Sequence, residues 1–198
     1  MKLTSLLLSF VIITQLVCTH SIGEEVQFFV TGAQGDGLLP GNIDPPTSSN
    51  GSGGLGSAGI VFDTDSNTLS IDILWGSENG FTDLTGEIIL LHLHGPTPSL
   101  PPDNFGEVNP DIIVNLGSSL NFNSSPTNGG LTDEYFLSNE EAEWLLAGRT
   151  YINVHTDLYE FGEIRGYVLP VNAIPEPATA GLFGLASLVA VSRRRRVV

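Results

Sequence analysis

Short stretches of alternating hydrophobic and polar residues, separated by loops rich in glycine, proline, serine and asparagine, make up the middle of the chain. In the stretch 68–75, apolar residues at 69, 71 and 73 alternate with polar residues at 70 and 72, which is the period of a half-buried β-strand. The same criteria predict strands at 26–31, 57–62, 68–75, 81–84, 87–94, 111–116, 150–156 and 163–169. We expect a hairpin across residues 63–67 and another across residues 157–162.

A single helix is predicted directly after residue 138. Ser138 can cap the helix, Glu141 stands three residues later and completes a capping box, and Gly148 offers a left-handed stop. Residues 32–56 and 121–130 are so rich in turn-forming residues that we predict long loops there, without regular elements. Short strands, turn-rich connections and one short helix together predict an all-β domain, built as an antiparallel β-sandwich or barrel.

The N-terminus has the pattern of a secretion signal. Lys2 precedes an apolar run at 6–17, and small or polar residues follow this run. Because the run is short for a membrane span, we assign residues 1–23 to a removable signal peptide and residues 24–173 to one exported domain. The single cysteine, Cys18, lies within the signal peptide, so we expect packing, without a disulfide, to stabilise the domain.

Residues 174–198 form a C-terminal tail with three parts. Its members are a Pro-Glu-Pro motif at Pro175, Glu176 and Pro177, an apolar run at 178–191, and the basic cluster Arg193, Arg194, Arg195 and Arg196. The arginines are expected to stay on the cytoplasmic side of the inner membrane, which places the domain outside. This arrangement resembles the PEP-CTERM sorting signal of Gram-negative bacteria. The resemblance implies a transient transmembrane helix, processing by an exosortase-type transpeptidase, and delivery to the cell surface or an exopolysaccharide matrix.

The charge of the chain is strongly negative. It has 22 acidic and 7 basic residues, for a formal net charge of −15. Most of the basic residues lie in the two ends, and only Arg149 and Arg165 belong to the domain. Because such a surface repels phosphate backbones, we expect no nucleic-acid partner. Hydrolase chemistry is not indicated either, since no Gly-x-Ser-x-Gly nucleophile motif is present.

Three polar phrases stand out in the predicted strands. They read His-Leu-His-Gly-Pro at 92–96, Tyr-Ile-Asn-Val-His-Thr at 151–156, and Gly-Glu-Ile-Arg-Gly at 162–166. In this order, with a hairpin near residue 65, they resemble the CHRD domain, which is named from chordin and is also found in exported bacterial proteins. The resemblance implies an extracellular β-sandwich module. The growth-factor ligands of animal members do not carry over, because no motif here encodes that recognition.

The histidines of these phrases have the spacing of metal ligands. His92 and His94 lie two residues apart on one predicted strand and therefore project from the same face. His155 lies on the polar face of a later strand. If the three converge, their neutral imidazoles would suit copper or zinc and leave a coordination position open.

This pattern is also similar to copper-zinc superoxide dismutases, which use a His-x-His strand and a later Val-His strand on a β-sandwich. The similarity implies an immunoglobulin- or superoxide-dismutase-like fold, in which His92, His94 and His155 match copper ligands and Arg165 a guiding arginine. This chain departs from those enzymes, because it offers no further histidine for a zinc site and no disulfide.

The same residues also have a purely structural interpretation. In it, the histidines form a hydrogen-bonded polar cluster with Asn153, Glu163 and Arg165, with Glu163 or Arg165 across the hairpin from His155. Under this interpretation, which we take first, no cofactor is needed, and copper remains the alternative.

The sequence therefore predicts a non-enzymatic cell-surface or exopolysaccharide-matrix module that an exosortase sorts and cleaves. Its other partners would be an exopolysaccharide or a surface protein, together with the inner membrane before processing. The alternative function is a copper-binding protein, with or without redox activity, that uses the three histidines.

Overall fold

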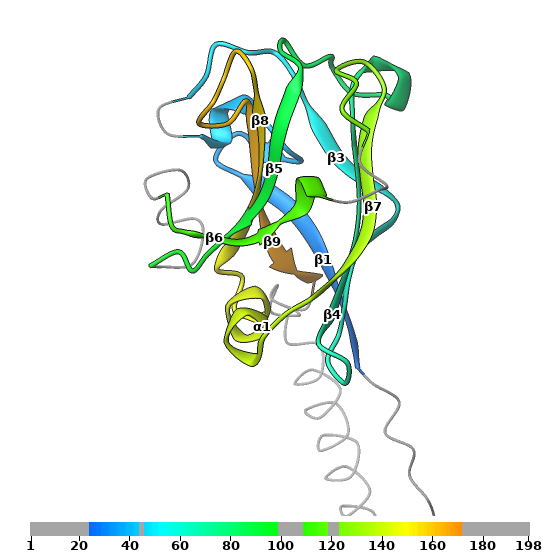
Figure 1. The fold of residues 1–198 in the computed structure, drawn as a ribbon, viewed down its shortest axis with the longest axis vertical. Helices are drawn as coiled ribbons and strands as arrows, with labels where there is room; N and C mark the ends of the chain where they lie inside the picture. Colours follow the sequence, from blue (N-terminus) through cyan, green and yellow to red (C-terminus); the bar gives the residue numbers. More distant parts are fainter. Residues whose placement is uncertain (1–23, 44–45, 99–108, 119–122, 172–198) are drawn as a thin grey trace, which may run out of the picture.

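A computed structural model describes residues 24–43, 46–98, 109–118 and 123–171 (Figure 1). The described residues form nine strands, one α-helix and three short 3-10 helices. The strands are β1 Glu25–Gly32, β2 Gly35–Asp36, β3 Gly53–Asp63, β4 Thr68–Trp75, β5 Ile88–His94, β6 Ile112–Asn115, β7 Gly129–Phe136, β8 Thr150–Thr156 and β9 Ile164–Pro170. The helices are α1 Asn139–Leu146, η1 Pro40–Asn42, η2 Ser77–Asn79 and η3 Leu116–Ser118.

The strands pair into one antiparallel sheet that curls into a nearly closed, barrel-like shape (Figure 1). Their order is β6-β5-β8-β9-β1-β3-β4-β7, and β2 pairs with the end of β1. The strands β6 and β7 are the two edges. Tyr135 of β7 donates its hydroxyl to the carbonyl of Leu116, directly after β6, at 2.9 Å. The predicted all-β, antiparallel fold with one short helix is confirmed, and of the two predicted architectures the sheet has the barrel-like one.

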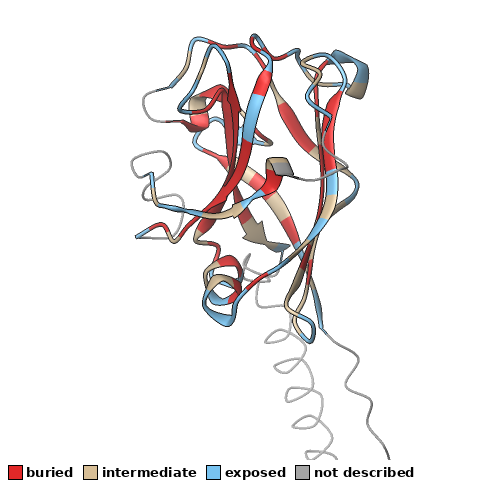
Figure 2. Ribbon diagram, in the orientation of Figure 1, coloured by how far each residue is buried: buried red, intermediate tan, exposed pale blue. Residues whose placement is uncertain are grey.

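The core fills the inside of this sheet. The apolar positions that alternate along β4, Leu69, Ile71 and Ile73, are at most 2% exposed, as the pattern predicted. Figure 2 shows buried positions running along the strands and on the inner side of α1, which contributes Leu145. Trp75 closes one end of β4, where its indole N–H donates to the carbonyl of Ser125 at 2.9 Å.

The predicted hairpins and the helix start are confirmed. Strands β3 and β4 pair across residues 64–67, and β8 and β9 pair across residues 157–163. At the start of α1, the hydroxyl of Ser138 accepts from the Glu141 backbone N–H, and the Glu141 carboxylate accepts from the Ser138 N–H. Gly148 follows the helix with a positive φ of 66°, the left-handed stop that was expected.

One strand was missed, one predicted strand is absent, and the loop predicted at 121–130 overlaps the first two residues of β7. The sequence did not predict β7, because its glycines and acidic residues have low strand propensity, yet it pairs with β4 along all eight residues. Conversely, residues 81–84 form no strand. Their backbone N–H groups bond to loops instead, Thr82 to the hydroxyl of Ser52 and Leu84 to the carbonyl of Pro126.

The segment 32–56, predicted to lack regular elements, contains β2, η1 and the beginning of β3. Leu38 and Leu39 bridge β3 and β9, through paired backbone hydrogen bonds to Gly53 and Arg165. Asn42 then anchors the segment, since its side-chain amide donates to the Arg165 carbonyl at 2.9 Å and its oxygen accepts from the Gln34 N–H. Ile43, Pro46 and Thr47 then lie beside residues of β8, where the site is.

The predicted signal peptide and the predicted sorting tail, with its transmembrane helix, lie outside the described residues. Within the described ranges, none of the helices has the length and apolar character needed to span a membrane.

Candidate functional site

The three histidines meet on the face of β5 and β8 that is turned away from the core. The residues next to the histidines on each strand, such as Leu93 and Val154, point into the core. Because successive side chains of a strand point to opposite faces, the histidines lie on the other face. On β5 and β8, His92 lies across from Asn153, and His155 lies two residues further along β8. One ring nitrogen from each histidine lies within 4.8 Å of the other two. The structure thus brings all three sequence candidates together.

Backbone carbonyls set the orientation of two of these rings. The Nδ1 atom of His94 lies 2.9 Å from the carbonyl oxygen of Pro110, and that of His155 lies 2.8 Å from the carbonyl oxygen of Glu160. Because a carbonyl only accepts, each neutral ring carries its proton on Nδ1 and has its lone pair on Nε2. Both Nε2 atoms are buried and have no hydrogen-bond partner among the described residues. The Nδ1 atom of His92 is likewise buried and has no hydrogen-bond partner among the described residues.

The electrostatics keep the rings neutral. The pKa of His94 is lowered to about 4, chiefly by burial and also by the nearby histidines and Arg165, while the hydrogen bond to the Pro110 carbonyl opposes this shift. Burial and, to a smaller extent, the charge of Arg165 lower the pKa of His155. The pKa of His92 is lowered by burial first and then by the charge of His155. Neutral imidazole is the form that binds a metal ion.

Aromatic rings and a guanidinium surround the histidines on the same face. Tyr151, directly across from His94, stacks on its ring, and Tyr167 of β9 lies across from Tyr151. The guanidinium carbon of Arg165 lies 4.1 Å from the centre of the Tyr151 ring. Burial raises the pKa of Tyr151 to about 12, so its hydroxyl stays protonated. This hydroxyl is also buried without a partner among the described residues.

The remaining members of the predicted polar cluster divide between two groups. Arg165 and Asn153 lie beside the histidines, where Arg165 donates to the side-chain oxygen of Asn109 and Asn153 donates to the Phe161 carbonyl. Glu163 is fully buried and belongs to a second group. Its carboxylate accepts hydrogen bonds from the Ser49 hydroxyl, the Thr85 and Gly86 backbone N–H groups and the Thr156 hydroxyl. Glu163 thus fastens two loops to the end of β8, as a structural anchor.

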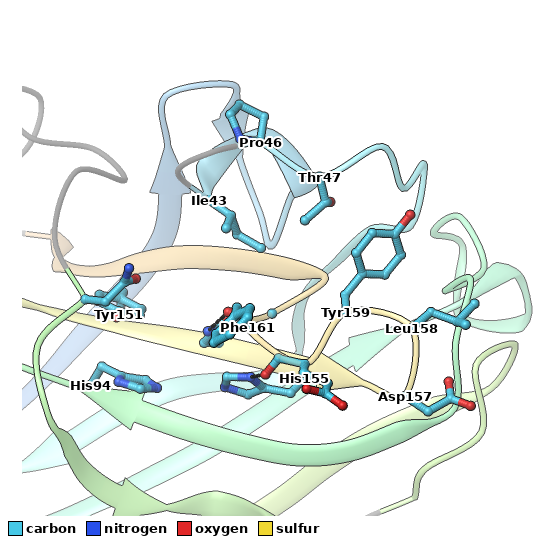
Figure 3. A pocket seen from close by; sticks show the side chains of 14 residues that line it. Ile43, Pro46, Thr47, His94, Tyr151, His155, Asp157, Leu158, Tyr159 and Phe161 are labelled. Atoms are coloured by element: carbon cyan, nitrogen blue, oxygen red, sulfur yellow. Dashed lines mark hydrogen bonds between the residues drawn. The ribbon is translucent and has the colours of Figure 1, made fainter.

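A pocket of about 870 Å³ opens beside the histidines. His94 and His155 form part of its floor with Tyr151 and Asn153, and the loop that follows His155 forms one wall (Figure 3). Sequence reasoning missed this pocket, because residues 157–162 had the appearance of a plain hairpin connection. The pocket could have been suspected from the three large apolar or aromatic residues in this short connection, Leu158, Tyr159 and Phe161.

The residues of the predicted sorting motif, Pro175 to Pro177 and the four arginines, lie outside the described residues. The comparison with family models nevertheless bears on them. The PEP-CTERM protein-sorting motif matches residues 173–196. This motif implies an exported protein with a surface location in Gram-negative bacteria, processed by an exosortase.

Comparison of the chain with curated proteins and with solved structures found no significant match. A family model for the CHRD domain matches residues 31–168, which include the end of β1, all of β2 to β8, most of β9, and the three histidines of the site. Neither this family nor that of the sorting motif is enzymatic. Because the match covers more than half of the chain, the chain belongs to the CHRD domain family.

Proposed function

We propose that this chain is a non-enzymatic surface module that an exosortase cleaves and that holds one transition-metal ion through His92, His94 and His155. The sorting motif supports the exported location, and the character of the two matched families supports the absence of catalysis. On the surface, the module would lie at the cell envelope or in an exopolysaccharide matrix, next to polysaccharide or other surface proteins.

One observation carries the metal-binding part of this proposal. Buried polar atoms are nearly always paired, because an unpaired one loses its bonds to water without replacement. Here the Nε2 atoms of His94 and His155 are both buried and unpartnered among the described residues, beside a third histidine. A metal ion would satisfy these lone pairs at once. The carbonyls of Pro110 and Glu160 act as the outer partners that orient metal-binding histidines.

The donor set favours borderline metals. Three neutral imidazoles suit both copper and zinc, and three protein ligands leave a coordination position for an external group. A redox-active copper protein is therefore the second candidate function. It requires that the bound metal be copper and that the copper change oxidation state reversibly.

Elemental analysis tests the metal site. The protein purified from cells grown with added copper and zinc is expected to contain one equivalent of metal, and the His94→Gln variant is expected to lose it. Tyr151→Phe is the matched control, because it alters the neighbouring ring without removing a ligand and should retain the metal. A protein that takes up neither metal contradicts the proposal, whereas copper that is reduced and reoxidised reversibly would favour the redox candidate.

Intact mass tests the sorting step. Protein released from the cell surface is expected to have lost the residues that follow the Pro-Glu-Pro motif, with the exact cut defined by the measured mass. Replacing Pro175, Glu176 and Pro177 by alanine should leave the tail attached and the protein in the membrane fraction. Released protein that still ends at Val198 would contradict the proposed processing.

A further inference from the structure

We infer that the pocket beside the histidines binds a small aromatic ligand that carries a metal-coordinating atom and, next to it, an N–H or O–H group. This inference rests on the metal site proposed above and specifies what takes its open position. It follows from the polar atoms of the pocket floor, the apolar residues of its wall, and its size.

The floor of the pocket carries four buried polar atoms that have no partner among the described residues. They are Nε2 of His94, Nε2 of His155, the hydroxyl of Tyr151 and the side-chain oxygen of Asn153. All four side chains are at most 9% exposed. Two of the atoms are metal ligands in the proposed function, which leaves two for a molecule in the pocket. The Asn153 oxygen accepts only, since the amide nitrogen already donates to Phe161. A complementary ligand therefore presents a hydrogen-bond donor close to its metal-binding atom.

The loop 157–162 places two solvent-exposed apolar side chains, Leu158 and Phe161, in the wall, beside the acidic Asp157 and Glu160. Phe161 is 89% exposed and Leu158 is 62% exposed, although burial would be favourable for both. Tyr159 and the buried Ile43 continue this apolar surface around the pocket (Figure 3). A flat aromatic body would bury part of Phe161 and Leu158 when bound, which gives the ligand an apolar contribution that a small inorganic ion lacks.

The size of the pocket fits the same class. Its volume of about 870 Å³ lies in the range of small-molecule sites, which join mostly apolar walls to a few convergent polar groups. The loop that forms the wall is also tied to the floor, because the Glu160 carbonyl accepts from His155 and the Phe161 carbonyl accepts from Asn153. The wall and the floor are therefore held in one fixed arrangement.

Two probes test this inference on the protein isolated from cells and loaded with Co(II), whose visible absorption reports its coordination. Imidazole offers a metal-binding nitrogen beside an N–H group, and 4-phenylimidazole adds only an aromatic ring. Both are expected to change the Co(II) spectrum, and 4-phenylimidazole is expected to bind about tenfold more tightly, from partial burial of its ring. Metal content measured after gel filtration shows that the ion stays on the protein.

Variants then locate the added ring. Phe161→Ala is expected to reduce the preference for 4-phenylimidazole to about threefold or less, with Leu158→Ala as a second variant of the same wall. Phe136→Ala is the matched control, because Phe136 is 75% exposed on β7 and does not line the pocket. The inference is overturned if 4-phenylimidazole binds no better than imidazole, or if the Phe161 and Phe136 variants behave alike. Failure of the protein to bind Co(II), copper or zinc at all would instead overturn the metal site itself.

Discussion

The ring of His94 lies flat on the ring of Tyr151, with centroids 4.9 Å apart and planes 7° from parallel. The two residues face each other across β5 and β8, so the sheet register sets this stack. The Pro110 carbonyl holds the edge of the same imidazole at Nδ1. His94 is thus fixed on its face and on its edge, while its Nε2 atom is left without a partner among the described residues.

The Tyr151→Phe variant is expected to be as stable as the original protein in the absence of metal, or more stable by up to about 1 kcal/mol. The hydroxyl that it removes is buried and unpartnered among the described residues, whereas the ring stack is kept. The matched control is Tyr135→Phe, which loses the bond to Leu116 and should cost about 1 kcal/mol. Urea denaturation measures both, and an equal loss in the two variants would contradict the prediction.

The Glu163→Gln variant is expected to lose about 2 to 4 kcal/mol of unfolding free energy. The carboxylate accepts from four donors at a fully buried position, and an amide nitrogen in place of one oxygen cannot accept from any of them. Glu160→Gln, at an exposed position, should change stability by less than about 0.5 kcal/mol. Denaturant melts of both variants check this, and similar midpoints would refute the anchoring role of Glu163.

Gly162→Ala is expected to lower the stability of the domain more than Gly35→Ala. Both glycines have a φ near 120°, a conformation that side-chain-bearing residues rarely adopt. A methyl group on Gly35 meets open space, whereas one on Gly162 collides with the side chain of Asn153. We expect Gly35→Ala to cost about 1 to 2 kcal/mol and Gly162→Ala at least about 1 kcal/mol more. Thermal melts compare the two variants. Equal losses of stability would contradict the prediction, since they would show that the Asn153 side chain moves aside without cost.

The metal-free domain is expected to lose stability as the pH falls from about 6.5 towards 4. The folded-state pKa values of His92, His94 and His155 lie below that of an unfolded histidine, and that of His94 lies at about 4. In this window the unfolded chain binds more protons than the folded one, so acid favours unfolding. Urea melts at pH 7, 6, 5 and 4.5 measure the slope.

The matched variant for this measurement is His94→Gln, which removes the group with the most depressed pKa. Its stability should depend less steeply on pH between about 6.5 and 4 than that of the original protein. Parallel curves for the two proteins would show that His94 does not contribute to the acid sensitivity.

Local chemistry accounts for the features that were predicted correctly. The period of two along β4 needs no knowledge of the rest of the chain, because successive side chains of any strand point to opposite faces. The capping box of Ser138 and Glu141 likewise joins residues three apart. The same period of two explains why His92 and His94 could be placed on one face from the sequence.

Features that depend on distant partners were predicted poorly or not at all. Strand β7 has low intrinsic propensity and forms because β4 offers a full row of backbone partners. Within the segment 32–56, Leu38 and Leu39 are held by backbone bridges to β3 and β9, which lie far away in the sequence or on another strand. Some of these contacts join residues more than a hundred positions apart, such as the hydrogen bond from Asn42 to the Arg165 carbonyl. A local sequence pattern does not encode contacts of this range.

By itself, the sequence determined the β-rich character of the domain, its helix, the pairing of its hairpins and the presence of three histidines on polar strand faces. Only the tertiary structure decided that His155 meets His92 and His94, that one buried nitrogen of each ring is left without a partner among the described residues, and that a pocket adjoins the cluster. The physical reason is the distance along the chain over which each interaction acts. Side-chain alternation and helix capping involve residues a few positions apart, whereas the site depends on strand register and on loops packed against β8 and β9.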